Sequence, residues 1–70
     1  MKIIHIHTET IRLSQLLKLA DLVQDGLEAK IHIQNGAVLV NGKVDKRRGR
    51  KLKHGDRVTF AESTLQVKRE

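Results

Sequence analysis

The sequence predicts an α+β fold in which two short adjacent helices pack on a small, mostly antiparallel sheet, in the order β-α-α-β-β-β-β. Apolar residues recur with a period of two near the N-terminus, which is typical of a strand. They recur with a helical period between residues 13 and 34, and short β-branched segments separated by turn residues follow. A chain of 70 residues is long enough for one small domain, residues 1–70, and no more.

The first strand is expected over Lys2–Thr8, where Ile4 and Ile6 alternate with His5 and His7. This alternation is typical of a strand with one buried face. The two histidines share the other face, and their spacing is suitable for binding a metal. A metal site needs a third or fourth ligand, however, and the sequence brings none to this strand. We therefore expect the pair on the polar side of an outer strand, and no metal or other cofactor.

The first helix is expected from about residue 14, because apolar residues recur there at intervals of three and four. This spacing forms one stripe along a helix. Thr10 and Ser14 are both suitable caps for its N-terminus, and the sequence does not choose between them. The stripe consists of Leu13, Leu16, Leu17, Ala20 and Val23.

A second helix is expected over residues 27–34. Asp25 is followed three residues later by Glu28, which is the aspartate variant of the capping box. Leu27 and Ile31 lie four residues apart and therefore on one side of the helix. We expect these two side chains to face the core.

Strand signals dominate the rest of the chain. The pair Asn35-Gly36 is expected to end the second helix, since both residues tolerate the left-handed conformation. The pair Asn41-Gly42 is a strong hairpin signal, because a type I′ turn needs positive φ at both positions. Further turns are expected at Gly55-Asp56 and at residues 62–64, on either side of a strand. The expected strands cover residues 38–40, 43–46, 57–61 and 65–68. Residues 47–56 are expected to form a loop that is rich in cations.

The net charge of +6 is concentrated in one segment, residues 43–57. Only Asp45 and Asp56 oppose the cations of this segment, whereas cations and acids balance over the rest of the chain. Such a patch predicts a polyanion as partner, although a basic loop also serves solubility. The cations of the segment are Lys43, Lys46, Arg47, Arg48, Arg50, Lys51, Lys53 and Arg57.

Several functional classes lack the residues they need. The chain has no cysteine, which removes disulfides, thiolate metal sites and a cysteine nucleophile. Its apolar runs fall far below the roughly 20 residues that span a bilayer, and the N-terminal segment lacks the apolar core of a secretory signal. No phosphate-cradling glycine loop and no catalytic constellation occur. We expect a non-catalytic, cytoplasmic, monomeric protein with no membrane partner.

The content of aromatic residues bears on the kind of nucleic acid. Phe60 is the single aromatic residue, and it shares a predicted strand with Val58, so we expect it in the core. Proteins that read single strands usually stack bases on aromatic side chains. The expected target is therefore a structured nucleic acid, recognised through its shape and its backbone. The charges alone do not separate RNA from duplex DNA.

Four segments follow one another in a specific order. They are Leu13-Ser-Gln-Leu-Leu-Lys18, Glu28-Ala-Lys30, Gly36-Ala-Val-Leu-Val-Asn-Gly-Lys43 and Lys51-Leu-Lys-His-Gly-Asp56. Together they resemble the RNA-binding domain of ribosomal protein S-four, also called the αL motif, over residues 11–60. The segment Asp45-Lys-Arg-Arg-Gly-Arg-Lys-Leu52 is most similar to the stand-alone bacterial YaaA/YbcJ-like subfamily.

This resemblance implies binding of structured RNA, with ribosomal RNA and transfer RNA as candidates and the ribosome as a possible setting. In such domains, basic side chains on the second helix and around the loop after the hairpin lie against RNA phosphates. Many members have Ser-Arg at the start of the second helix, where this chain has Asp25-Gly26-Leu27. Because the acidic Asp25 would repel phosphate, RNA contact is expected mainly from the loop at residues 46–53. The matching RNA-binding residues are Lys30, Lys43, Lys46, Arg47, Arg48, Arg50, Lys51 and Lys53.

A β-grasp-like protein-interaction module is the alternative. The run from Val40 to Lys43, followed by Leu52, Gly55-Asp56 and Val58, also resembles the end of small sulfur-carrier proteins. Those proteins finish with Gly-Gly, whereas this chain ends in Lys-Arg-Glu70, and the two adjacent helices fit them poorly. An adaptor for acidic proteins or lipids would use the same basic patch without nucleic-acid specificity.

Overall fold

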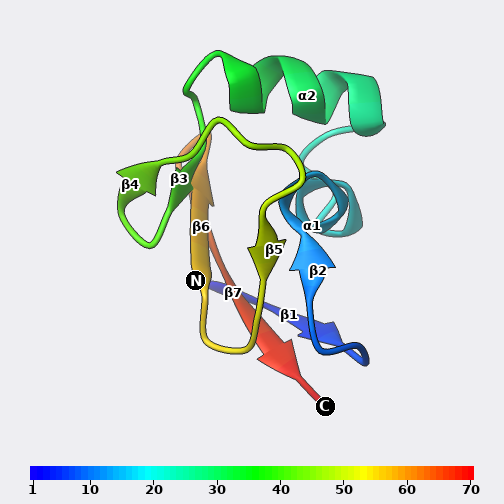
Figure 1. Ribbon diagram of the computed structural model, residues 1–70. Coiled ribbons are helices and arrows are strands. Elements are labelled where there is room, and N and C mark those ends of the chain that lie inside the picture. Colours follow the sequence, from blue (N-terminus) through cyan, green and yellow to red (C-terminus); the bar gives the residue numbers. More distant parts are fainter.

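The computed structural model describes residues 1–70 and confirms the predicted fold class. Two helices pack against a five-stranded sheet of order β1-β7-β6-β3-β4 (Figure 1). Strand β1 runs parallel to β7, and the other neighbours are antiparallel. Neither helix is long and apolar enough to cross a membrane. The elements are β1 Lys2–Ile6, β2 Ile11–Arg12, α1 Leu13–Leu19, α2 Gly26–Gln34, β3 Leu39–Val40, β4 Lys43–Val44, β5 Lys51–Leu52, β6 Arg57–Phe60 and β7 Ser63–Arg69.

The two strands that lie outside the main sheet form a sheet of their own. In this antiparallel pair of β2 and β5, Ile11 lies opposite Leu52 and Arg12 opposite Lys51. The expectation of an uninterrupted loop over residues 47–56 is therefore wrong. A two-residue strand shows no periodicity, and the one signal in the sequence is Leu52, an apolar residue among cations that is fully buried. The pairing ties the basic segment to the start of α1.

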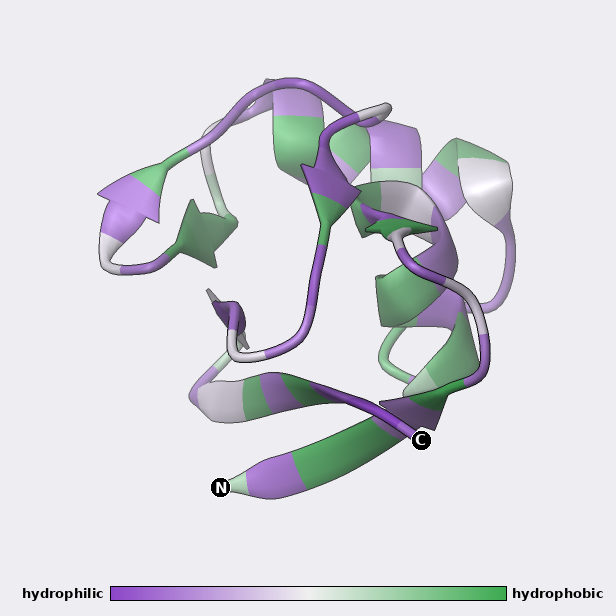
Figure 2. Cartoon of the chain, turned by 60° about the horizontal axis from the view of Figure 1, so that its bottom comes forward, coloured by the Kyte–Doolittle hydropathy of each residue, from purple (hydrophilic) through white to green (hydrophobic).

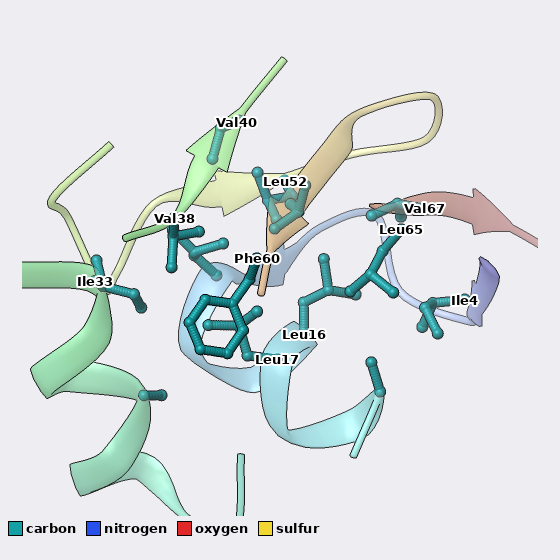
Figure 3. Close-up of a cluster of buried hydrophobic side chains, with 14 of the residues drawn as sticks. Ile4, Leu16, Leu17, Ile33, Val38, Val40, Leu52, Phe60, Leu65 and Val67 are labelled. Carbon is teal, nitrogen blue, oxygen red and sulfur yellow. The ribbon is translucent and has the colours of Figure 1, made fainter. Parts of the chain in front are cut away.

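One cluster of 16 buried apolar residues forms the core. Figure 3 shows Leu16 and Leu17 of α1 converging with Ile33 of α2 and Phe60 of β6. Phe60 is only 8 % exposed, which confirms it as a core residue. Burying one large apolar side chain contributes about 1.5–3 kcal/mol, so this cluster is the main source of stability.

The N-terminus of α1 is capped from a distant part of the chain. Its N-cap residue is Arg12, so neither Thr10 nor Ser14 caps the helix. The N–H of Arg12 donates to Oε1 of Gln15 at 3.3 Å. The N–H groups of Leu13 and Ser14 donate to the backbone carbonyl groups of residues 50 and 48. Local sequence reasoning misses this cap because its acceptors lie more than 30 residues away.

The predicted cap of α2 is confirmed, but the predicted inward face is wrong. Asp25 is the N-cap, and its Oδ1 accepts from the N–H of Glu28 at 2.9 Å. Leu27 and Ile31 are 67 % and 50 % exposed, whereas Ala29 and Ile33 are fully buried. Both pairs have the same spacing of four, so periodicity does not distinguish them. The residues of α2 that face the core are therefore Ala29 and Ile33.

Two tight hairpins frame the middle of the sheet. Asn41 and Gly42 have φ of 51° and 86°, which confirms the predicted turn between β3 and β4. The turn predicted at residues 62–64 lies instead at Ala61-Glu62, because Phe60 pairs with Ser63. Both turn residues have positive φ without glycine, so no composition signal marks them.

Candidate nucleic-acid interface

The segment from residue 45 to residue 50, called here the basic loop, connects β4 to β5. It leaves the β3–β4 hairpin, passes beside α2 and reaches the start of α1 (Figure 1), and it is mostly hydrophilic (Figure 2). At its α1 end the carbonyl oxygen of Arg50 accepts from the N–H of Leu13 at 2.8 Å. The carbonyl oxygen of Arg48 accepts from the N–H of Ser14 at 3.2 Å. Because the first N–H groups of a helix have no partner within it, the basic loop serves as the cap of α1.

Asp45 anchors the other end of the basic loop. It is only 8 % exposed, and its N–H donates to the carbonyl oxygen of Val38 at 3.1 Å. Its carboxylate accepts two hydrogen bonds from the Arg47 guanidinium, at 3.1 and 2.9 Å. It also accepts one from the Arg47 backbone N–H at 2.9 Å and one from the Arg50 guanidinium at 2.7 Å. We call this group of Asp45, Arg47 and Arg50 the Asp45 clamp.

The clamp sets the charge state of Asp45. Hydrogen bonding from the Arg47 guanidinium is the main cause that holds the pKa of Asp45 well below its usual range, although burial opposes it. The same pair raises the pKa of Arg47. Asp45 is therefore ionised at neutral pH, and its charge offsets part of the positive charge beside it. The Arg50 side chain is 32 % exposed and that of Arg47 is 70 % exposed, so only Arg47 keeps most of its surface in solvent.

A basic hollow lies where the basic loop meets both helices. Arg12 lies at the start of α1, Lys30 lies on α2, and Arg48 comes from the basic loop. No acidic residue lines this hollow, which has a volume of about 480 Å³. We call it the helix hollow. Its lining residues are Arg12, Ser14, Gly26, Leu27, Lys30, Arg48 and Gly49.

A second hollow, called here the hairpin hollow, lies between the β3–β4 hairpin and the basic loop. Its volume is about 620 Å³. The stem of Lys46 also passes over Gly36, where a Cβ would lie 3.5 Å from the Lys46 Cε. Two of the cations of this hollow already bind Asp45. Its lining residues are Val40, Asn41, Lys43, Val44, Asp45, Lys46, Arg47 and Arg50.

The candidate RNA-binding residues thus divide into three groups. Lys30 and Arg48 line the helix hollow, whereas Lys43, Lys46, Arg47 and Arg50 line the hairpin hollow. Lys51 is exposed on β5 opposite Arg12, and Lys53 is exposed beyond β5, outside both hollows.

Sequence reasoning missed two residues of this interface. Arg12 lies outside the basic segment, and only the β2–β5 pairing brings it to the helix hollow. In the sequence, Asp45 is an acid in a segment of many cations, and nothing there shows that its carboxylate pairs with Arg47 and Arg50. Asp25, which the sequence places at the N-terminus of α2, caps that helix and does not line the hollow.

None of the four histidines lines either hollow. His5 is exposed on β1, the edge strand of the sheet, and pairs with Glu70, as expected for the polar side of an outer strand. His54 accepts a hydrogen bond at Nδ1 from the N–H of Arg69 at 3.0 Å. His32 lies beside Phe60, with ring centroids 4.8 Å apart. No group of three or more metal-ligating side chains is present.

The comparison with protein families agrees with this geometry. Residues 4–68 match the family model of the S4 domain. The chain belongs to the S4 domain family. This match spans both helices, the basic loop and nearly all of the sheet. The resemblance inferred from the ordered sequence segments is thus confirmed.

Bacterial relatives of this S4 domain are similar over most of its length. The probable ribosome maturation protein RlbA of Bacillus subtilis (strain 168) is 55 % identical over 53 residues, which cover 76 % of this chain and 75 % of that protein. The putative RNA-binding protein YbcJ of Escherichia coli (strain K12) is 41 % identical over 63 residues, which cover 90 % of this chain and 86 % of that protein.

The solution structure of YbcJ from Escherichia coli has the same fold. It matches with a TM-score of 0.75 at 35 % sequence identity, over 97 % of this chain and 87 % of that one. That structure is described as revealing an αL motif involved in RNA binding. The helix pair and sheet of the present chain therefore have the architecture of the αL-motif relative.

Proposed function

We propose that this S4 domain is a non-catalytic RNA-binding module that holds structured RNA through phosphate contacts. The observation that carries the proposal is the helix hollow, where Arg12, Lys30 and Arg48 meet from three separate elements. No acid lines this surface to neutralise them. The relatives named for RNA binding and for ribosome maturation support RNA as the polyanion, with ribosomal and transfer RNA as candidates.

The chemistry of the hollow suits a phosphate backbone. An arginine presents a planar fork that binds two phosphate oxygens, and a lysine acts as a point charge. None of the seven lining residues is aromatic, so the site favours contact with the backbone over stacking of bases. A concave, charged surface of this kind reads the shape of a folded RNA. We infer that the module acts as a cytoplasmic monomer, in association with the ribosome or another structured RNA.

The deciding experiment compares two nucleic acids at two salt concentrations. The protein is titrated with an RNA stem-loop and with a DNA duplex of equal length. We expect tighter binding to the RNA, and a log–log salt slope of about −0.7 to −0.9 for each phosphate neutralised. Equal affinity for both would instead favour the alternative, a polyanion-binding adaptor without nucleic-acid specificity. Absence of binding to either at low salt would overturn the proposal.

A further inference from the structure

We propose that Asp45 is a positioning residue for RNA binding, which holds the basic loop in the shape that presents Arg48 to the helix hollow. This inference rests on the proposed RNA-binding function. It assigns a role to a residue that touches no RNA, and that carries the same sign of charge as RNA. Arg47 and Arg50 then act through Asp45 as well as through their own charge.

The cost of burying Asp45 indicates that it has a specific role. It is the single charged or polar residue among the 17 buried residues of the chain. Burial of a carboxylate is unfavourable unless it is paired and hydrogen-bonded. Four hydrogen bonds from two arginines satisfy this carboxylate. A segment that served only to attract a polyanion would be more effective without this acid, because the acid cancels positive charge.

The path of the backbone shows what the clamp positions. Asp45 binds Arg47 on one side of Arg48 and Arg50 on the other. The N–H of Arg50 donates to the carbonyl oxygen of Arg47 at 3.1 Å, which closes a turn around Arg48 and Gly49. The carbonyl oxygen of Arg48 is itself fixed by Ser14. Arg48 therefore sits at the tip of a turn whose base is clamped, and its side chain is exposed at the helix hollow.

A rigid arrangement of cations favours a rigid ligand. A folded RNA presents its phosphates at fixed positions, so binding gains when the cations are already in place. A flexible single strand adapts to any arrangement and responds mainly to the amount of charge. Loosening the clamp should therefore weaken binding of a stem-loop, even though removal of the Asp45 charge makes the protein more positive.

The test compares Asp45→Asn with Asp21→Asn, because each variant removes one negative charge. Asp21 is exposed in a turn away from both hollows and has a φ of 62°, a conformation that asparagine tolerates. Each protein is titrated with an RNA stem-loop and with a uridine homopolymer. We expect Asp45→Asn to lose about fivefold or more in stem-loop affinity while its homopolymer affinity is unchanged or higher. Asp21→Asn should change each affinity by less than about twofold.

A second pair of variants covers the case in which Asp45→Asn does not fold, which circular dichroism at the titration temperature would show. Arg50→Gln removes one donor of the clamp, and Arg57→Gln removes the same charge from an exposed site in the same basic segment. We expect Arg50→Gln to lower stem-loop affinity more than homopolymer affinity. Arg57→Gln should lower both affinities by the same factor.

Four outcomes would overturn the inference. Tighter stem-loop binding by Asp45→Asn would mean that Asp45 only repels phosphate. Parallel losses for both RNAs would mean that it only maintains the fold, and results equal to those of Asp21→Asn would mean that it has no role in binding. Failure of the unmodified protein to bind either RNA would instead overturn the proposed function, and this inference with it.

Discussion

The helix hollow and the hairpin hollow are both lined by lysine and arginine side chains, yet the cations of the two hollows have different partners. In the hairpin hollow, Asp45 binds the guanidinium groups of Arg47 and Arg50. In the helix hollow, Lys30 and Arg48 have no acid beside them among the lining residues. Positive charge counted along a sequence therefore differs from positive charge that is available to a ligand. The fold determines which cations pair with an acid of the protein and which remain available to a ligand.

The largest expected effect concerns the cations of the helix hollow. The double variant Lys30→Ala/Arg48→Ala should lose about 100-fold in affinity for an RNA stem-loop, because each charge-assisted hydrogen bond contributes roughly 1.5 kcal/mol. The salt slope should become shallower by roughly 0.7 to 0.9 for each phosphate that is no longer neutralised. Fluorescence anisotropy at several salt concentrations measures both quantities.

The matched control is Lys18→Ala/Lys68→Ala, which removes the same charge from two exposed sites outside both hollows. We expect this control to lose less than about fivefold, since exposed charges beyond a Debye length of about 8 Å are largely screened at physiological salt. Equal losses of stem-loop affinity in the two double variants would show that the helix hollow contributes no more to RNA binding than other exposed cations do.

The second expected effect concerns stability and separates two arginines of the basic loop. Arg50→Ala should lower the free energy of unfolding by about 1–3 kcal/mol, because it leaves the buried Asp45 carboxylate with fewer donors. Arg48→Ala should change it by less than about 0.5 kcal/mol, as expected for an exposed side chain. Urea denaturation of the two variants measures the difference. Removal of all the cations of the basic loop at once would mix a binding defect with a folding defect, so single variants are needed.

How far the sequence predicts the molecule depends on the range of the interaction. The capping pair of Asp25 and Glu28 and the turn at Asn41-Gly42 are local, and both are confirmed. The buried face of α2 was predicted wrongly, since Leu27 and Ile31 have the same spacing as the pair that is buried. Packing against α1 and the sheet decides between them, and spacing within one helix does not carry that information.

The candidate site follows the same rule. The ordered motifs predict the family and the basic segment, because both are visible along the chain. The contribution of Arg12 depends on a pairing of two-residue strands about 40 positions apart, which leaves no periodic signal. The role of Asp45 depends on its burial, and no sequence feature distinguishes this buried acid from Asp56, the other acid of the basic segment.

The third prediction uses pH to isolate the clamp. The folded state lowers the pKa of Asp45, whereas the unfolded chain has the ordinary value of about 3.9. The unfolded chain therefore takes up the proton first, and the stability that Asp45 contributes is present above about pH 4 and lost as the pH falls further. The free energies of unfolding of the unmodified protein and Asp45→Asn should converge by about 1–2 kcal/mol between about pH 6 and pH 3.

Urea titrations at several pH values measure this convergence, and the other carboxylates cancel because both proteins contain them. A difference in unfolding free energy that stayed constant across the acid range would contradict a charge-dependent clamp. In that case the Asp45 side chain would stabilise the loop by its shape alone.

The smallest expected effect concerns Lys53, which the sequence places among the RNA-binding residues. Its side chain lies outside both hollows, and its backbone N–H donates to the carboxylate of Asp56 at 2.9 Å, so the turn after β5 holds it in place. Lys53→Ala should therefore lower stem-loop affinity by about twofold or less at physiological salt. A loss as large as that of Arg48→Ala, measured in the same titration, would extend the RNA-binding surface past β5. Because Lys53 and Arg48 belong to one continuous basic segment, this comparison tests whether the fold or the local density of charge defines the interface.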